Sequence, residues 1–512
     1  MTDQISRVVL TAINAKYIHS SLSSRYLLAN LGEFEPATEF LEFTILERAQ
    51  DIAEQILVKQ PDCIIFSCYI WNITLTEEVV CIIRAVRPQT LIVLGGPEVS
   101  YPEYAPAVNA KANHVICGEG EEALPNLLRS LNAGLPVAHT IFASPVALCD
   151  IALPYHLYSD ADIAHRIIYV ESSRGCAYGC EFCLSSLDEK VRHFDSARVI
   201  EALDRLWQRG VRQFKFIDRT IHFSKAKPIL RFFLDRLCPE LFLHFEIVPD
   251  RITDSLIELL QSFPDGAVQL EAGVQTMNPD VSCSIGRRQN MEKTVRNIRR
   301  IVEETGVHIH SDLVVGLPGE TMESLAEGFN CLLDTGVHEI QVGILKRLRG
   351  APIDRHTLES GMIYRETPPY DILQNAHISF MDMQRLKRFS RYFDIVVNNG
   401  NFKFTAPLIW KDRSPFYGFL AFSDWLFEQS ERTAGIALDR LAEYLFDYLV
   451  TVQLMDSSHC ANTLRDDYAA NGRPRLPKCV REFASTPQNA YSESMKKQKA
   501  SGIPERQRRH RQ

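Results

Sequence analysis

Short apolar runs alternate with amphipathic stretches over the first 135 residues. Helical patterns cover about 20–32, 47–59 and 74–87, and the apolar runs lie at 7–13, 39–45, 63–69, 90–96 and 114–120. A continuous apolar run such as CIIFSCY is typical of a strand that is buried on both faces. Strands that alternate with helices predict a parallel sheet covered on both sides, so we expect a doubly wound, Rossmann-like α/β domain at 1–135.

A second alternating series begins at residue 166, after a less regular stretch. That stretch, 136–165, is rich in Pro, Ala and Asp and predicts a linker. The apolar runs of the second series lie at 166–172, 214–218, 241–247, 267–273, 308–316 and 339–345. Six βα units are fewer than the eight of a closed barrel, so 166–354 predicts a partial (β/α)6 TIM-type barrel with an open side.

The strand–helix alternation stops after about residue 355. Helical patterns at 382–395 and 416–450 predict a mainly α-helical C-terminal domain over 355–486. The last 17 residues hold seven Lys or Arg, and the polar tail at 487–512 is expected to be disordered.

Composition narrows the classes of protein and partner. Hydrophobic residues make up 46% and charged residues 23% of the 512, which is typical of soluble globular proteins, and the net charge of −8 argues against a nucleic-acid partner. The N-terminal MTDQISRVVL lacks the basic start and apolar run of a signal peptide, and no run of 18 apolar residues suggests a membrane span. We therefore expect a cytoplasmic protein without a membrane partner, whose 13 cysteines are thiols.

Three of these cysteines are clustered. The segment SSRGCAYGCEFCLSS places Cys176, Cys180 and Cys183 directly after the strand predicted at 166–172. A structural zinc site takes four ligands, and no fourth Cys or His is paired nearby, although a zinc-binding scaffold or regulatory protein remains an alternative. Three thiolates from one loop suit a [4Fe–4S] cluster, which leaves one iron open to a small chelating molecule.

This CxxxCxxC motif, with Phe182 before the last cysteine, resembles the radical S-adenosylmethionine (SAM) superfamily. The resemblance implies that SAM binds the open iron through its amino and carboxylate groups, with Phe182 against the adenine. It implies reductive cleavage of SAM to a 5′-deoxyadenosyl radical that takes hydrogen from a substrate. It also implies a reductant such as flavodoxin or ferredoxin, and a small-molecule or peptide substrate that the sequence does not identify.

Residues after the other barrel strands fit the same resemblance. FIDRT puts Asp218 where the family usually has a Gly-Gly-Glu stretch that holds the amino group of SAM, so the sequence departs from the family there. The further contacts to SAM that the resemblance implies are Glu246, Glu271, Gln275, Asp312 and Gly316.

The N-terminal domain resembles the cobalamin-binding branch of this superfamily. Ser67 follows the third strand, Gly95 and Gly96 follow the fourth, and Glu119 follows the fifth in VICGEGEEALP. Glycines at such a place let a long ligand tail enter between sheet and helix. The Asp-x-His-x-x-Gly motif that supplies histidine to cobalt is absent, and Asn14 begins the stretch that replaces it. An inert scaffold is the alternative.

The resemblance covers residues 5–350. The segments YDILQ and SPFYGF are similar to a C-terminal domain of unassigned function that one subgroup contains. The implied activity is that of a cobalamin-dependent radical SAM enzyme, most often the methylation of an unactivated carbon. Cyclisation, ring contraction or oxidation is the alternative within the branch. The catalytic residues and the lower cobalt ligand stay open.

Overall fold

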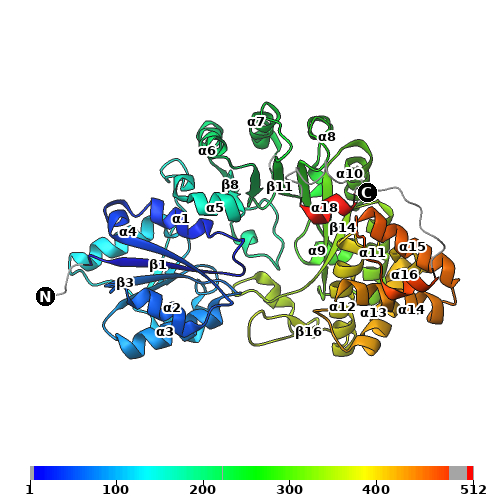
Figure 1. The fold of residues 1–512 in the computed structure, drawn as a ribbon. Helices are drawn as coiled ribbons and strands as arrows, with labels where there is room; N and C mark the ends of the chain where they lie inside the picture. The colour runs from blue at the N-terminus through cyan, green and yellow to red at the C-terminus, as the bar shows by residue number, and fades with distance from the viewer. Residues whose placement is uncertain (1–4, 189, 222, 484–503, 511–512) are drawn as a thin grey trace. The chain divides into compact units, whose positions relative to one another are not determined.

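The computed structural model of the chain describes residues 5–188, 190–221, 223–483 and 504–510. The chain forms two compact units (Figure 1). The first unit contains residues 1–219, 346–354 and 365–371, and the second contains 220–345, 355–364 and 372–512. In these described ranges, no helix is long and apolar enough to cross a membrane.

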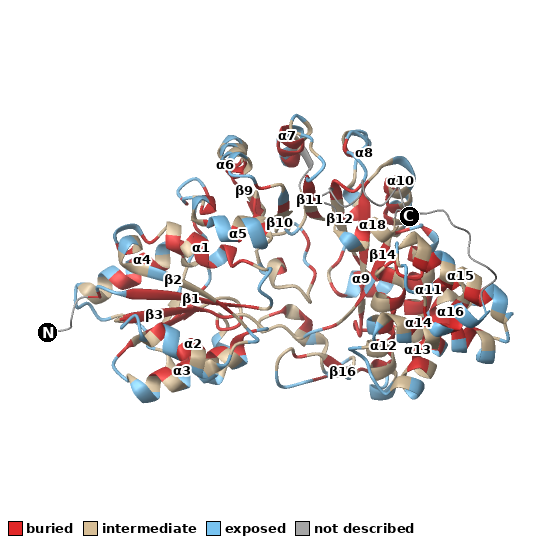
Figure 2. Ribbon diagram, in the orientation of Figure 1, coloured by how far each residue is buried: buried red, intermediate tan, exposed pale blue. Residues whose placement is uncertain are grey.

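The first unit contains a six-stranded parallel sheet of order β2-β1-β3-β4-β5-β6. Its strands are β1 (Val8–Asn14), β2 (Thr38–Thr44), β3 (Cys63–Ser67), β4 (Leu91–Gly95), β5 (His114–Cys117) and β6 (Thr140–Phe142). The first five coincide with the predicted apolar runs, and β1 and β3 are buried along their whole length (Figure 2). The predicted doubly wound fold is confirmed.

Helices cover both faces of this sheet because successive strand residues point to opposite sides. The helices are α1 (Leu22–Ala29), α2 (Ala49–Leu57), α3 (Ile73–Val86) and α4 (Gly120–Asn132). Ile64 and Phe66 of β3 join the core beneath α2 and α3, whereas Cys63 and Ile65 join the core beneath α1 and α4. The two helix pairs lie on opposite sides of the strands in Figure 1.

The stretch predicted as a linker, 136–165, is structured. It contributes the sixth strand β6, the 3-10 turn Tyr155–Leu157 and helix α5 (Asp160–His165), whose N-terminus is closed by a capping box of Ser159 and Asp162. Strand β6 has only three residues and is half-exposed. Such a short segment shows no clear apolar periodicity, so the sequence did not predict this strand.

The barrel region contains a second six-stranded sheet of order β14-β13-β12-β11-β10-β7, and each of the six predicted runs forms one strand. The strands are β7 (Ile168–Val170), β10 (Gln213–Phe216), β11 (Phe242–Ile247), β12 (Val268–Gln275), β13 (His308–Val315) and β14 (Glu339–Ile344). The accompanying helices are α6 (Ser196–Gln208), α7 (Phe223–Leu234), α8 (Asp254–Leu260), α9 (Pro279–Ser284), α10 (Met291–Glu304) and α11 (Met322–Asp334).

The C-terminal region is mainly helical, as predicted, and it packs on the last strand of the sheet. A short hairpin, β15 (Ile363–Tyr364) and β16 (Ile372–Gln374), precedes α12 (Phe380–Phe393), α13 (Pro415–Ser430), α14 (Leu438–Asp447), α15 (Ser457–Ala470) and α16 (Lys478–Phe483). Ser390 donates to the carbonyl of Val342 at 2.5 Å. The side-chain amide of Asn398 bonds both the N–H and the C=O of Ile340, at 3.1 and 2.8 Å. These side chains satisfy polar backbone groups of β14.

Part of the tail that we expected to be disordered is a helix, α18 (Glu505–His510). Arg506 contacts the carboxylates of Glu339 and Asp394 at 2.6 and 2.7 Å, and His510 lies 2.6 Å from the carbonyl of Asn398. A buried carboxylate such as Glu339 requires cationic partners, and Arg506 of the tail is one of them. The composition of the tail alone could not predict this pairing. The expectation is therefore wrong for 504–510, while 487–503 and 511–512 lie outside the described residues.

Replacing Arg506 with glutamine is expected to lower the free energy of unfolding by about 1 kcal/mol at pH 7, since Arg506 stays one-third exposed. Burial alone would raise the pKa of Glu339, but His308 and Arg506 outweigh it and lower that pKa to about 2. The stabilisation is therefore present above about pH 4.5 and lost as the pH falls toward 2. Urea denaturation should show the difference from the parent shrinking over this range. Arg48→Gln, which removes an exposed pair with Asp51, is the control and should change nothing.

Candidate functional site

The cysteine motif lies in a loop that a short antiparallel hairpin closes. The hairpin strands are β8 (Ser173–Arg174) and β9 (Arg192–His193), and the Cys176 N–H donates to the carbonyl of Asp188 at 3.0 Å. Gly175 has φ +87°, and a Cβ there would lie 2.4 Å from the carbonyl oxygen of Lys190. The chain therefore needs glycine immediately before the first cysteine of the motif.

All 13 cysteines are thiols. Cys180 is buried, whereas Cys176, Cys183 and the intervening Phe182 are partly exposed. Among the residues that the structure describes, no three His, Cys, Asp or Glu side chains gather around a single metal-sized site. A cubane takes each cysteine at a different iron, so its ligands need not converge on one point. Three thiols on one pinned loop are the donor set that such a cluster requires.

Asp218 holds the start of this loop. Its carboxylate accepts the N–H of Ser172 at 3.0 Å and the hydroxyls of Ser172 and Ser173 at 2.7 and 2.5 Å. The side chain is fully buried, and burial raises its pKa even though these donors oppose the shift. The carboxylate is thus occupied by the turn between β7 and β8.

A cavity of about 660 Å³ lies beside the hairpin, entirely within the first unit. Four of the five residues expected to contact cobalamin line it: Ser67, Gly95, Gly96 and Glu119. The hairpin contributes to the same wall through residues on both sides of the cysteine loop: Ser173, Arg174, Gly175, Ser185 and Asp188. The volume is within the range of cofactor sites, roughly 300–1,000 Å³. One cavity therefore joins the ends of the N-terminal strands to the cysteine loop.

The two glycines of the cavity wall differ in whether the backbone could accept a side chain. Gly96 has φ +105°, and a Cβ there would lie 2.5 Å from the carbonyl oxygen of Cys68, so the backbone itself demands glycine. At Gly95, a Cβ would have one neighbour within 4 Å, the carbonyl oxygen of Ile116 at 3.8 Å. Gly95 thus leaves open space that a side chain would fill.

The remaining two polar candidates of this domain are held by protein partners. Asn14 donates to the Glu42 carboxylate at 3.0 Å and does not line the cavity. Glu119 accepts the N–H of Val146 at 2.8 Å and ion-pairs with Arg192. Burial alone would raise the pKa of Glu119, but these donors and Arg174 outweigh it and lower that pKa. Glu119 is therefore held by a backbone donor and by two arginines.

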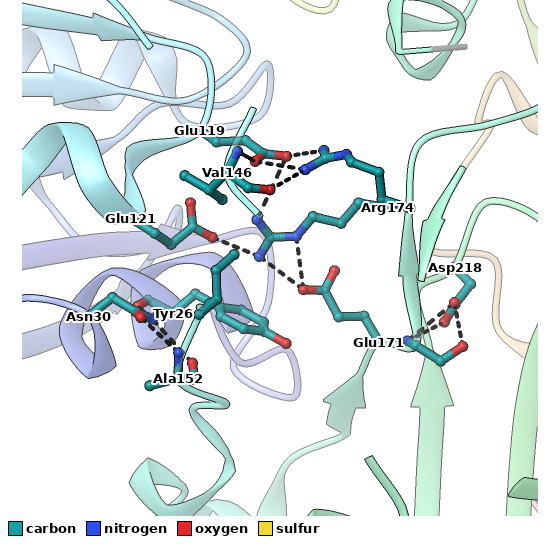
Figure 3. A network of polar contacts seen from close by, with 12 residues as sticks. Tyr26, Asn30, Glu119, Glu121, Val146, Ala152, Glu171, Arg174 and Asp218 are labelled. Atoms are coloured by element: carbon teal, nitrogen blue, oxygen red, sulfur yellow. Dashed lines mark hydrogen bonds and ion pairs between the residues drawn. The ribbon is translucent and has the colours of Figure 1, made fainter. Parts of the chain in front are cut away.

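Arg174 is the centre of a network that the sequence did not single out (Figure 3). Its guanidinium lies 2.7 Å from Glu121, 3.0 Å from Glu171 and 3.7 Å from Glu119. It also lies over the ring of Tyr26, 4.8 Å from the centroid. Burial raises the pKa of Glu171 to about 7, although Arg174 opposes the shift. The network connects the N-terminal domain to the segment that directly follows β7.

The second unit brings several other candidates together on one face of its sheet. Glu246 is in register with Glu271, and Glu271 is in register with His310, on three adjacent strands. Glu271 is 3.0 Å from His244, and Asp312 is 3.1 Å from His310. Burial alone would lower the pKa of His310, but Asp312, Glu339 and Glu271 outweigh it and raise that pKa. This face of the sheet therefore carries a cluster of titratable side chains in close contact.

Gln275 and Gly316 lie at the carboxyl ends of their strands. Gln275 has φ +74° and follows an irregularity in the pairing of β12 with β13. Gly316 has φ +93°, and a Cβ there would lie 2.6 Å from Ile372 of β16, so backbone conformation and packing against the hairpin already account for this glycine.

Sequence reasoning missed His244, His310, Arg174 and Arg192. A signal was present for the histidines, because FLHFEI and HIHSDLVV place polar residues at every second position, on the face opposite the apolar ones. The arginines carried none, since their partners are distant in sequence.

Comparisons with known proteins agree with this arrangement. Residues 8–128 match the B12 binding domain family, residues 170–332 the radical SAM superfamily, and residues 359–511 a family described as a protein of unknown function, DUF4080. The matched families imply a [4Fe–4S] cluster, SAM and cobalamin as cofactors, as the sequence predicted.

Relatives and solved structures extend the likeness. The 2-(S-pantetheinyl)-carbapenam-3-carboxylate methyltransferase of Streptantibioticus cattleyicolor is 25% identical over 363 residues, 63% of this chain and 52% of that protein. The chain spans about half the length of the curated relatives that it matches.

Among solved structures, the cobalamin-dependent SAM radical enzyme OxsB with aqua-cobalamin bound has a TM-score of 0.63 at 13% identity, covering 94% of this chain and 83% of that one. The radical SAM methyltransferase TsrM of Kitasatospora setae, with cobalamin and a [4Fe–4S] cluster, has a TM-score of 0.55 at 16% identity, covering 75% and 82%. At these identities the likeness is one of fold. The chain belongs to the radical SAM superfamily, with a B12-binding domain before the barrel and a DUF4080 domain after it.

Proposed function

We propose that this chain is a cobalamin-dependent radical SAM enzyme that methylates an unactivated carbon. The observation that carries the proposal is the cavity that Gly95 and Gly96 share with the cysteine hairpin. A single cavity bounded by the proposed corrinoid site and the proposed cluster site is what a reaction that uses both cofactors requires.

The residues of the chain have separate tasks in this proposal. When bound, the cluster and cobalamin supply one-electron cleavage of SAM and delivery of a methyl group, respectively. Cys176, Cys180 and Cys183 would hold three irons of the cluster, and Phe182 would lie against the adenine of SAM. Asp218 keeps the loop in place through Ser172 and Ser173.

Further contacts to SAM are proposed for the polar face of the second unit. Glu246, Glu271 and Asp312 lie on this face, and Gln275 is the last residue of β12. Carboxylates and an amide there offer acceptors for the ribose hydroxyls and the amino group of SAM.

Cobalamin is proposed to enter through the glycine pair. Gly95 lines open space at the end of β4, and Ser67 lines the same wall at the end of β3. Ligands of open α/β sheets bind at this carboxyl edge of the strands. The relative from Streptantibioticus cattleyicolor is a methyltransferase, which supports methyl transfer over the other reactions of the branch.

The test is anaerobic reconstitution of the full chain with iron, sulfide and cobalamin, followed by incubation with SAM and a reductant. We expect about four irons and one corrinoid per chain, and formation of 5′-deoxyadenosine. Untargeted comparison of metabolites between a deletion strain and its parent then identifies candidate substrates, and a product heavier by one methylene unit supports methylation.

Several outcomes would contradict the proposal at different levels. Zinc in place of iron would exclude radical chemistry. A protein that holds the cluster but retains no corrinoid through gel filtration would make the N-terminal domain a scaffold. A product with a new ring or an oxidised carbon, and no added methyl group, would replace methyl transfer by one of the alternative reactions.

A further inference from the structure

The hairpin that closes the cysteine loop places two arginines directly opposite each other. Arg174 of β8 pairs in register with Arg192 of β9. Like charges opposite each other in an antiparallel pair destabilise it. A hairpin only two residues long on each strand has few other contacts to offset this repulsion. Its stability therefore depends on carboxylates supplied from elsewhere.

Glu119, which immediately precedes helix α4 of the B12-binding domain, supplies the carboxylate between these arginines. One oxygen, Oε1, contacts Arg192 and lies 3.7 Å from Arg174. The other, Oε2, accepts from Arg192 at 3.2 Å and from the N–H of Val146 at 2.8 Å. A single side chain thus contacts both strands of the hairpin and fixes its own orientation through a backbone donor.

Three further carboxylates contact the two arginines, so that four carboxylates surround two guanidinium groups. Arg174 also contacts Glu121 and Glu171, and Arg192 also contacts Asp188 at 3.0 Å. Glu121 belongs to the B12-binding domain, whereas Asp188 belongs to the cysteine loop and receives the Cys176 N–H on its carbonyl. Arg174 and Arg192 have side chains only 14% and 22% exposed, so water screens these pairs weakly.

The contacts of Glu119 with Arg174 and Arg192, called the bridge below, lie at the wall of the shared cavity. Glu119, Glu121, Arg174 and Asp188 all line it. The bridge therefore fixes the distance between Gly95 and Gly96 of the B12-binding domain and the loop that carries the cysteines.

We propose that Glu119 is a positioning residue that locks the cysteine hairpin onto the B12-binding domain by bridging Arg174 and Arg192. The inference rests on the proposed function, because the distance it fixes is that between the two cofactor sites. Glu119, expected from the family resemblance to contact cobalamin, acts in this proposal through the arginines instead.

Hydrogen exchange of the purified full chain tests the bridge without any cofactor. Glu119→Gln keeps the shape of the side chain and removes its charge. We expect amide exchange in 172–194 to become about tenfold faster, because the two opposed arginines lose their shared counter-charge. The matched control is Glu33→Gln, which removes a carboxylate of the same domain from an exposed pair with Arg129 and should leave the hairpin unchanged.

A double-mutant cycle separates the bridge from independent contributions. Arg192→Gln alone should also accelerate exchange of the hairpin, since Glu119 then loses its main partner. The double variant should be no faster than the faster single variant, because either single change already removes the contact between Glu119 and Arg192. Additive effects would contradict a shared bridge.

The reconstituted protein gives a spectroscopic readout that a general loss of stability would not produce. In the parent, the reduced cluster should broaden the cob(II)alamin EPR signal by a single amount, set by one fixed distance. Glu119→Gln should keep its iron and corrinoid, and its broadening should become smaller and spread over a range.

Hairpin exchange equal to that of the parent, or acceleration of the same size throughout the first unit, would overturn the proposal. Unchanged broadening in Glu119→Gln would also overturn it. Failure of the proposed function is distinguishable, because a parent that binds no corrinoid still gives the exchange result.

Discussion

Replacing any one of Cys176, Cys180 and Cys183 with alanine is expected to abolish the formation of 5′-deoxyadenosine from SAM. Two thiolates cannot hold a cubane with one iron open to SAM. Because the loop is closed by its own hairpin and by the Asp218 carboxylate, each variant should keep its fold. The measurement is 5′-deoxyadenosine by mass spectrometry after anaerobic reconstitution, together with iron per chain and a circular dichroism spectrum.

Cys149→Ala is the matched control for these variants. Cys149 is an exposed thiol of the same unit and lies outside the motif. It should keep the full iron content and the parental rate of SAM cleavage. If a variant of the motif cleaves SAM at the parental rate, the assignment of the cluster to these cysteines is wrong.

Much of the fold follows from hydrophobic pattern alone, because parallel strands covered on both faces are nearly continuous apolar runs. This is why β3 coincides with the run at 63–69 and β14 with that at 339–345. The pattern fails for β6, which has three residues and one sheet neighbour in the strand order. It fails also for α18, whose polar residues are held by the buried Glu339 and not by an apolar stripe.

Some residues of the candidate site could likewise be predicted from local sequence patterns, and others could not. The cysteine motif and the glycine pair were located from the sequence because each is a local pattern directly after an apolar strand. The role of Asp218 could not be predicted, since its partners Ser172 and Ser173 lie 46 and 45 residues away. Nor could the bridge at Glu119, because the pairing of Arg174 with Arg192 exists only once the hairpin closes.

Tertiary context also decides which glycine variant can test the corrinoid site. A Cβ at Gly96 would meet the backbone of Cys68 at 2.5 Å, in a region of positive φ. Substitution there strains the fold whether or not a ligand is present. Gly95 has no such conflict, so a loss of ligand in a Gly95 variant reports on the cavity.

Replacing Gly95 with leucine is therefore expected to weaken cobalamin binding by about ten- to a hundredfold, the cost of forcing extra methylenes into an occupied space. The nearest neighbour of the new Cβ is the carbonyl oxygen of Ile116 at 3.8 Å, so the remainder of the side chain extends into the cavity.

Gly95→Ala is the matched control, because its single methyl group would lie at an ordinary van der Waals distance from its neighbour. This variant should bind cobalamin nearly as the parent does. Binding is measured by corrinoid absorption retained through gel filtration and by titration with hydroxocobalamin. Iron per chain should stay constant across the series, because Gly95 lies in the B12-binding domain and the cysteines lie on the hairpin loop. If Gly95→Leu is soluble, keeps its iron and retains stoichiometric corrinoid, cobalamin does not occupy this cavity, and the ends of β3 and β4 must be abandoned as its site.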